Sequence, residues 1–130
     1  MSMQLPRPEL ACHDEAMRKP FPDIVAELRE ILGARLVAYI GRVKETRAVR
    51  EWAEGTREPG SAATERRLRL TYGIARCIAQ ADGRETAQAW FQGLNPLLDD
   101  SSPARLLRED DLDAVGPRVI TAERHFLANG

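Results

Sequence analysis

The fold of the C-terminal half is decided by one stretch, Ala89-Trp90-Phe91-Gln92-Gly93-Leu94-Asn95-Pro96-Leu97-Leu98. Gly93 and Pro96 end a helix, and Ser102-Pro103 begins another, because glycine and proline interrupt helices while serine caps them. The tryptophan and the paired leucines supply apolar surface. The pattern predicts a helix end, a tight apolar corner and a new helix, with Trp90 packed inward.

Helical spacing of apolar residues accounts for most of the rest of the chain. A first helix follows Pro22, with Asp23 as its N-cap, and ends at Gly33. A second ends at Gly41, and a third ends at Gly55. Further helices are expected over the ranges 62–81, 84–91 and 117–127, the last one separated from preceding residues by Gly116-Pro117. The fold class predicted is all-α.

The length and composition are those of one small domain, or of two very small ones that share a core. Of the 130 residues, 43% are hydrophobic and 30% are charged. No apolar run approaches the roughly 18 residues that span a bilayer. Prolines and charges near the N-terminus do not fit a signal peptide, so a cytoplasmic protein with no membrane partner is expected.

Charge is distributed unevenly along the chain. Residues 33–84 carry 11 Lys and Arg against 6 Asp and Glu, a net charge of +5, whereas residues 85–130 carry 4 against 8, a net charge of −4. Such asymmetry favours an anionic partner for the middle and a basic partner for the end. The alternative is that these charges only solvate exposed helix faces.

The sequence offers no catalytic machinery and no cofactor motif. It lacks a glycine-rich phosphate loop, a Gly-x-Ser-x-Gly motif and a His-Glu-x-x-His motif. Cys12, His13, Cys77 and His125 match no familiar zinc spacing, so no metal is expected, and Cys12 is assigned to an irregular tail. Catalytic residues, cofactors and metal ligands are therefore all predicted to be absent.

The segment around Trp52 predicts a DNA-binding element. Two short helices joined at a glycine turn form a helix-turn-helix, in which Ala48, Val49, Trp52 and Ala53 face inward. The outward side chains predicted to contact DNA are Lys44, Thr46, Arg47 and Arg50. Glutamates among these arginines oppose phosphate binding, so a helical core without DNA binding remains the alternative.

Both Trp-centred motifs resemble a known family. Trp90 near a helix end, then Asn95-Pro96 and later Leu107, resembles the toxin-binding domain of the Xre/MbcA/ParS-type antitoxins, and the segment ending in Trp52 resembles their helix-turn-helix. The resemblance implies three segments. They are an irregular arm (1–22), an Xre-like helix-turn-helix (23–61) and a helical toxin-binding domain (62–130), the last two joined by a long helix.

The same resemblance implies a function. Such an antitoxin, which is not an enzyme, blocks a RES-type toxin with an ADP-ribosyltransferase-like fold that uses NAD, and also represses its own operon. A homodimer or a hetero-oligomer with the toxin is expected. The chain end would enter the toxin's cleft, and the toxin-binding residues are predicted to be Arg118, Arg124, Phe126, Leu127, Asn129 and Gly130. The competing hypothesis is a stand-alone transcriptional regulator whose C-terminal domain only dimerises.

Overall fold

The computed structural model describes the backbone of residues 8–129 and the side chains of residues 11–129. The described chain is all-α, as predicted. Its elements are α1 (Pro8–Arg18), α2 (Phe21–Leu32), α3 (Ala34–Ile40), α4 (Thr46–Glu54), α5 (Ala62–Asp82), α6 (Arg84–Gln92), the short 3-10 helix η1 (Pro96–Leu98), α7 (Pro103–Glu109) and α8 (Leu112–Asn129). None of the helices within this described part is both long and apolar enough to cross a membrane.

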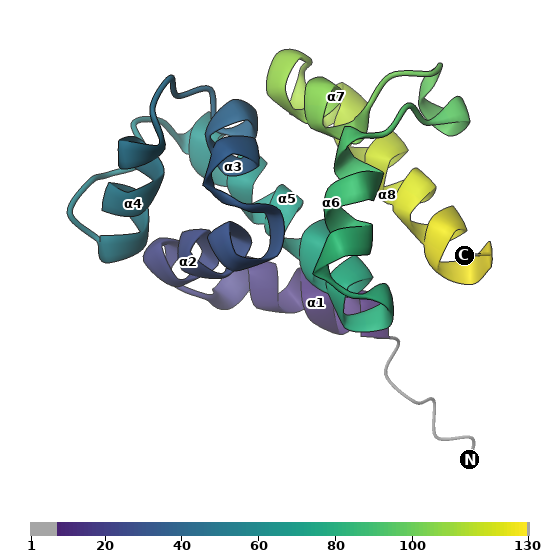
Figure 1. Cartoon of the computed structure of the whole chain (residues 1–130), viewed down its shortest axis with the longest axis horizontal. Coiled ribbons are helices and arrows are strands. Elements are labelled where there is room, and N and C mark those ends of the chain that lie inside the picture. The colour runs from purple at the N-terminus through teal and green to yellow at the C-terminus, as the bar shows by residue number, and fades with distance from the viewer. Residues whose placement is uncertain (1–7, 130) are drawn as a thin grey trace.

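The long helix α5 lies at the centre of the molecule (Figure 1). Helices α1, α2, α6 and α8 all contact it. It can pack against all four because its apolar residues cover more than one face of the helix. Leu68, Tyr72 and Ile78 are fully buried among these residues. Helices α2, α3 and α4 lie to one side of α5 in Figure 1, whereas α6, α7 and α8 lie to the other.

Trp52 fixes the packing of α2, α3 and α4. Its ring is 1% exposed, meets Phe21 edge to face, and donates from Nε1 to the Glu58 carbonyl oxygen at 3.0 Å. Gly41 ends α3 against this ring, because a Cβ at that position would lie 3.0 Å from Trp52 Cζ3. The short helices predicted to end at Gly41 and Gly55 are therefore present.

The two sides share one hydrophobic core. Buried residues of α2, α5, α6, α7 and α8 form a continuous cluster, and α2 contacts α6 while α3 contacts α7. The boundaries 23–61 and 62–130 remain predictions, since continuous packing crosses residue 62.

The expectation of an irregular arm over residues 1–22 is wrong for residues 8–18, which form α1. Cys12 and Ala16 are buried, and α1 lies along α5. Arg69 of α5 donates from Nη1 to the carbonyl oxygens of Ala16 and Lys19, at 2.9 and 2.7 Å, so it satisfies backbone groups at the end of α1. Tertiary contact stabilises a segment whose own periodicity is weak.

The predicted interruption at Gly116-Pro117 is also wrong, because α8 runs without a break from Leu112 to Asn129. Proline removes a single backbone donor, whose partner would be the carbonyl of Asp113, a residue on the exposed side of the helix. Gly116 is buried, and a Cβ there would lie 3.4 Å from Leu70 Cδ2 of α5. Close helix packing therefore offsets the loss of that hydrogen bond.

Candidate functional site

The corner between α6 and α7 is held by its own polar side chains. Asn95 Oδ1 accepts from the Leu97 amide at 2.9 Å, and Ser102 Oγ accepts from the Arg105 amide at 3.2 Å. Asp99 and Asp100 both have left-handed backbone conformations, with φ of 55° and 62°. Non-glycine residues rarely adopt that conformation, and such strain concentrates at functional sites.

This corner displays apolar side chains outward. Leu94 is 76% exposed and Leu97 is 50% exposed, whereas Leu98 is 1% exposed and anchors the corner in the core. Isolated exposed leucines are common on proteins, but these two lie beside further apolar surface.

Trp90 and Phe126 supply that surface. Trp90 is half-buried, with its ring edge to face on Phe91 at a centroid distance of 5.2 Å and 6.4 Å from the ring of Phe126 in α8. We call the hollow of about 280 Å³ formed by Trp90, Leu94, Leu97 and Phe126 the α6–α8 groove. The expectation that Trp90 packs inward is confirmed only in part, because Trp90 packs against the core but its ring also forms one wall of this groove.

The predicted toxin-binding residues are distributed along α8. Phe126 lines the groove and Leu127 is half-buried nearby, while Arg124 is exposed. Arg118 Nη2 pairs with Asp99 Oδ2 of the corner at 2.9 Å, and Asn129 Nδ2 donates to the His125 carbonyl oxygen at 2.9 Å. Gly130 lies outside the described residues.

Sequence reasoning missed Leu94 and Leu97 as site residues. The signal was present, because Leu-Asn-Pro-Leu-Leu contains more leucines than a tight corner can bury. Only the backbone of η1 decides which of them points to the core.

The predicted DNA-binding residues all lie on the exposed face before and along α4. Lys44, Thr46, Arg47 and Arg50 are exposed. Lys44 and Arg47 line a hollow of about 290 Å³ together with Arg57. Arg50 instead approaches Glu54 at 3.8 Å, and Arg57 approaches Glu51 at 3.4 Å, so carboxylates partly neutralise this face.

A polar network connects α1, α2 and α5. The Tyr72 hydroxyl donates to the Glu27 carboxylate, and Lys19 Nζ lies 2.9 Å from Glu27 Oε2. Burial, followed by the hydrogen bond to Glu27, raises the pKa of Tyr72 to about 12. The hydroxyl therefore stays protonated as a donor at neutral pH.

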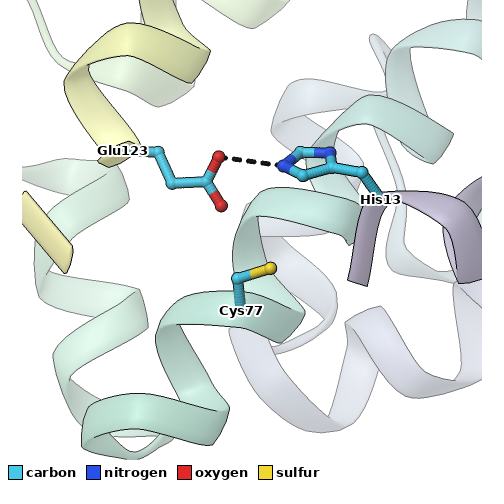
Figure 2. A group of neighbouring side chains, drawn as sticks. All are labelled: His13, Cys77 and Glu123. Carbon is cyan, nitrogen blue, oxygen red and sulfur yellow. Dashed lines mark hydrogen bonds and ion pairs between the residues drawn. The ribbon is translucent and has the colours of Figure 1, made fainter. Parts of the chain in front are cut away.

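A second polar cluster is buried where α1, α5 and α8 meet (Figure 2). His13 Nε2 lies 2.9 Å from Glu123 Oε1, and Cys77 lies beside both. Burial raises the pKa of the Cys77 thiol well above its usual range, and a hydrogen bond with Cys12 adds to the effect. Cys12 is buried within α1 instead of lying in a tail, while His125 is exposed on α8.

No protein-family model and no curated protein matches the sequence. The fold matches a chain in the crystal structure of the M. tuberculosis MbcT-MbcA toxin-antitoxin complex. The TM-score is 0.67 at 25% sequence identity, over 85% of this chain and 96% of that chain. The predicted resemblance to the MbcA-type antitoxin family is confirmed by this match.

Proposed function

We propose that this chain is an antitoxin that binds a toxin through the α6–α8 groove and the end of α8. The observation that carries the proposal is an apolar groove, walled by Trp90 and Phe126 and extended by the exposed Leu94 and Leu97, in a fold that matches a chain of a toxin-antitoxin complex. Aromatic anchors surrounded by apolar contacts are typical of interface hot spots.

The corner supports this role by holding its leucines in place before binding. Two side-chain caps, at Asn95 and Ser102, stabilise the backbone of the corner. An ion pair between Asp99 and Arg118 connects the corner to α8. Because the corner is already ordered, little conformational entropy is lost when a partner covers Leu94 and Leu97, and the affinity is higher for that reason.

The toxin we propose is of the RES type, with an ADP-ribosyltransferase-like fold and NAD as its substrate, as the family resemblance implies. A cleft that binds NAD phosphates contains arginines or helix N-termini. The exposed end of α8, with Arg124 beside it, would approach that cleft as an inhibitory plug. The chain itself needs no NAD and no catalytic residue for this role.

The test is a pull-down and a growth-rescue assay with the co-encoded toxin. Leu94→Asn combined with Leu97→Asn is expected to weaken toxin binding at least tenfold, since burying each leucine contributes about 1.5–3 kcal/mol. Met17→Asn is the matched control, because Met17 of α1 is as exposed as Leu94, at 76%, but lies outside the groove.

The same double variant separates this proposal from a stand-alone regulator with a dimerising C-terminal domain. If the double variant becomes monomeric while no toxin binds the unmutated chain, the groove is a dimer contact and the antitoxin proposal fails. Full rescue of growth by the double variant would remove the groove from the toxin interface.

We also propose that the α3–α4 unit binds operator DNA as a helix-turn-helix and represses the operon. Support comes from the exposed Lys44, Thr46 and Arg47 and from the net positive charge of residues 33–84. Electrophoretic mobility shifts with the promoter region of the operon test this second activity.

A further inference from the structure

The buried cluster between α1, α5 and α8 carries an inference independent of toxin and DNA binding. His13, Cys77 and Glu123 each offer one ligand atom, and these atoms all lie within 4.8 Å of one another. Figure 2 shows the three side chains converging from helices that belong to the beginning, the middle and the end of the chain. Cys77 is 5% exposed and Glu123 is 0% exposed.

The carboxylate of Glu123 is incompletely satisfied. Oε1 contacts His13 Nε2, whereas Oε2 is buried and meets no donor in good hydrogen-bond geometry among the described residues, although the Cys77 thiol lies beside the carboxylate. Buried carboxylate oxygens almost always have a donor or a cation, so an orphaned one calls for an explanation. Oε2 is the second oxygen of the same Glu123 carboxylate, so a cation bound in the cluster could contact it.

The donor set fits one class of ligand. An imidazole nitrogen, a sulfur and a carboxylate oxygen together suit zinc, whereas calcium and magnesium prefer oxygen alone. We propose that His13, Cys77 and Glu123 bind a Zn²⁺ ion. The Cys77 thiol would lose its proton to solvent and bind as the thiolate.

The required rearrangement is small. Tetrahedral zinc with bonds of about 2.0–2.3 Å holds its ligand atoms about 3.3–3.8 Å apart. The His13–Glu123 pair at 2.9 Å has to open slightly, and ligand atoms up to 4.8 Å apart have to close by about one ångström. Rotation of the side chains of three packed helices can supply such shifts without moving the backbone.

A groove borders the cluster at His13, whereas neither Cys77 nor Glu123 lines it. His13 is one wall of a mainly apolar groove of about 460 Å³ between α1, α5 and α8, which Met17, Leu70 and Ile120 also line. With three protein ligands, a tetrahedral Zn²⁺ ion has a fourth coordination position, which a water molecule from the groove beside His13 would occupy. Arg76 acts electrostatically on Cys12 nearby, which opposes a cation and sets a limit on the affinity.

The position of the His13 ring is set by a glycine. A Cβ on Gly73 would lie 2.5 Å from His13 Nδ1, so the ring occupies space that only glycine leaves open. The Nε2 edge is thereby directed toward Glu123. Gly73→Ala is therefore a way to displace one ligand while Cys77 and Glu123 remain unchanged.

The test uses the full chain after metal removal with a chelator, titrated with Zn²⁺ by calorimetry and with Co²⁺ by absorption spectroscopy. We expect one ion per chain, a thiolate-to-Co²⁺ charge-transfer band and a higher melting temperature with Zn²⁺. Cys77→Ser should abolish the charge-transfer band. Glu123→Gln should weaken Zn²⁺ binding at least tenfold.

His125→Gln is the matched control, because His125 is an exposed histidine of α8 outside the cluster. It should leave affinity and spectrum unchanged. Melts of each metal-free variant verify folding, and Gly73→Ala, which should also lose Zn²⁺, replaces Glu123→Gln if that variant does not fold.

The proposal is overturned if the unmutated chain binds no Zn²⁺ at tenfold molar excess. It is also overturned if binding survives both Cys77→Ser and Glu123→Gln but disappears in His125→Gln, since that result assigns the ion to the surface. In either case the cluster is a buried His13–Glu123 pair that only joins α1 to α8.

Discussion

The two tryptophans occupy different environments, and substitutions should separate stability from binding. Trp52 is 1% exposed in the core, so Trp52→Ala is expected to cost about 3–5 kcal/mol of unfolding free energy. Trp90 is half-buried at the groove, so Trp90→Ala is expected to cost roughly half as much, about 1.5–2.5 kcal/mol.

The opposite order is expected for toxin affinity, because an aromatic wall of a groove is a typical hot spot. Trp90→Ala should weaken toxin binding at least about tenfold, whereas any folded Trp52 variant such as Trp52→Phe should bind normally. Chemical denaturation and calorimetric titration with the toxin measure the two effects. Equal stability losses at both positions would mean that Trp90 is buried.

Tyr72 gives the molecule a defined response to alkali. Its pKa is raised from 10.0 to about 12, so its contribution to stability is complete below pH 10 and is lost as the pH rises through about 12. Tyr72→Phe should therefore lose less stability than the unmutated chain over this interval. Urea unfolding at a series of pH values measures the difference.

Tyr39→Phe is the control for this experiment, because Tyr39 is 38% exposed and forms no hydrogen bond with the Glu27 network within the described part of the chain. It should reproduce the alkaline loss of the unmutated chain. A loss of the same size in Tyr72→Phe would show that the phenol does not titrate as inferred.

At the scale of the element, helix α4 and the residues before it should determine the salt dependence of DNA binding. Neutralising Lys44 and Arg47 with glutamine removes two phosphate contacts, so the slope of log K against log salt should fall by about 1.8, at roughly 0.9 per contact. Arg50→Gln should change the slope less, because Arg50 approaches Glu54 at 3.8 Å. Fluorescence anisotropy with operator DNA gives the slopes.

Toxin binding by the Lys44 and Arg47 variant should be unaffected, since α4 lies on the other side of α5 from α6 and α8 (Figure 1), whose residues form the groove. An unchanged slope in that variant would exclude this face from DNA. Failure of the unmutated chain to bind DNA would favour the helical core without DNA binding.

Elements with strong periodicity and a glycine at the end could be predicted from the sequence, as α3, α4, α5 and α6 illustrate. The periodicity of α2 was also predictable, but the expected N-cap was wrong: α2 begins at Phe21 after Pro20, and Asp23 lies inside its first turn. Helix α1 could not, because its buried residues include the small Cys12 and Ala16 and its end is satisfied by Arg69, more than fifty residues away. The continuity of α8 depends on the contact between Gly116 and Leu70, which no local pattern contains.

The candidate sites likewise could be predicted where neighbouring residues of one helix form them, and could not where distant helices do. Exposed basic residues of α4 were predictable because one helix carries most of them. The groove was predictable only in part, since Trp90 and Phe126 come from separate helices and η1 selects which leucine faces out. The His13–Cys77–Glu123 cluster was not predictable, because Glu123 resembles any other charge of an amphipathic helix until α8 is placed on α5.

At the scale of the whole molecule, truncation after Arg124 tests the inhibitory plug. The last buried residue of α8 is Glu123, so the truncated chain keeps every fully buried side chain of that helix. We expect it to remain folded, with a modest fall in melting temperature from the lost contact between Phe126 and Trp90. Protection from the toxin should be abolished.

Melting curves and the toxin's NAD consumption, measured on one sample of the truncated chain, distinguish the outcomes. A folded truncated chain that still inhibits fully would exclude the plug. Operator binding should persist, because the basic hollow at Lys44 and Arg47 receives no contact from the deleted residues in the described part of the chain.

The meeting of α1, α5 and α8 at one cluster also constrains how the chain can be made. His13 and Glu123 are separated by 110 positions, so more than a hundred further residues have to be synthesised after His13 before this contact can form. Until then, α5 exposes the apolar face that α8 will cover, and such surfaces attract chaperones and proteases. Chains that stop before α8 should consequently be degraded more readily than chains that contain it.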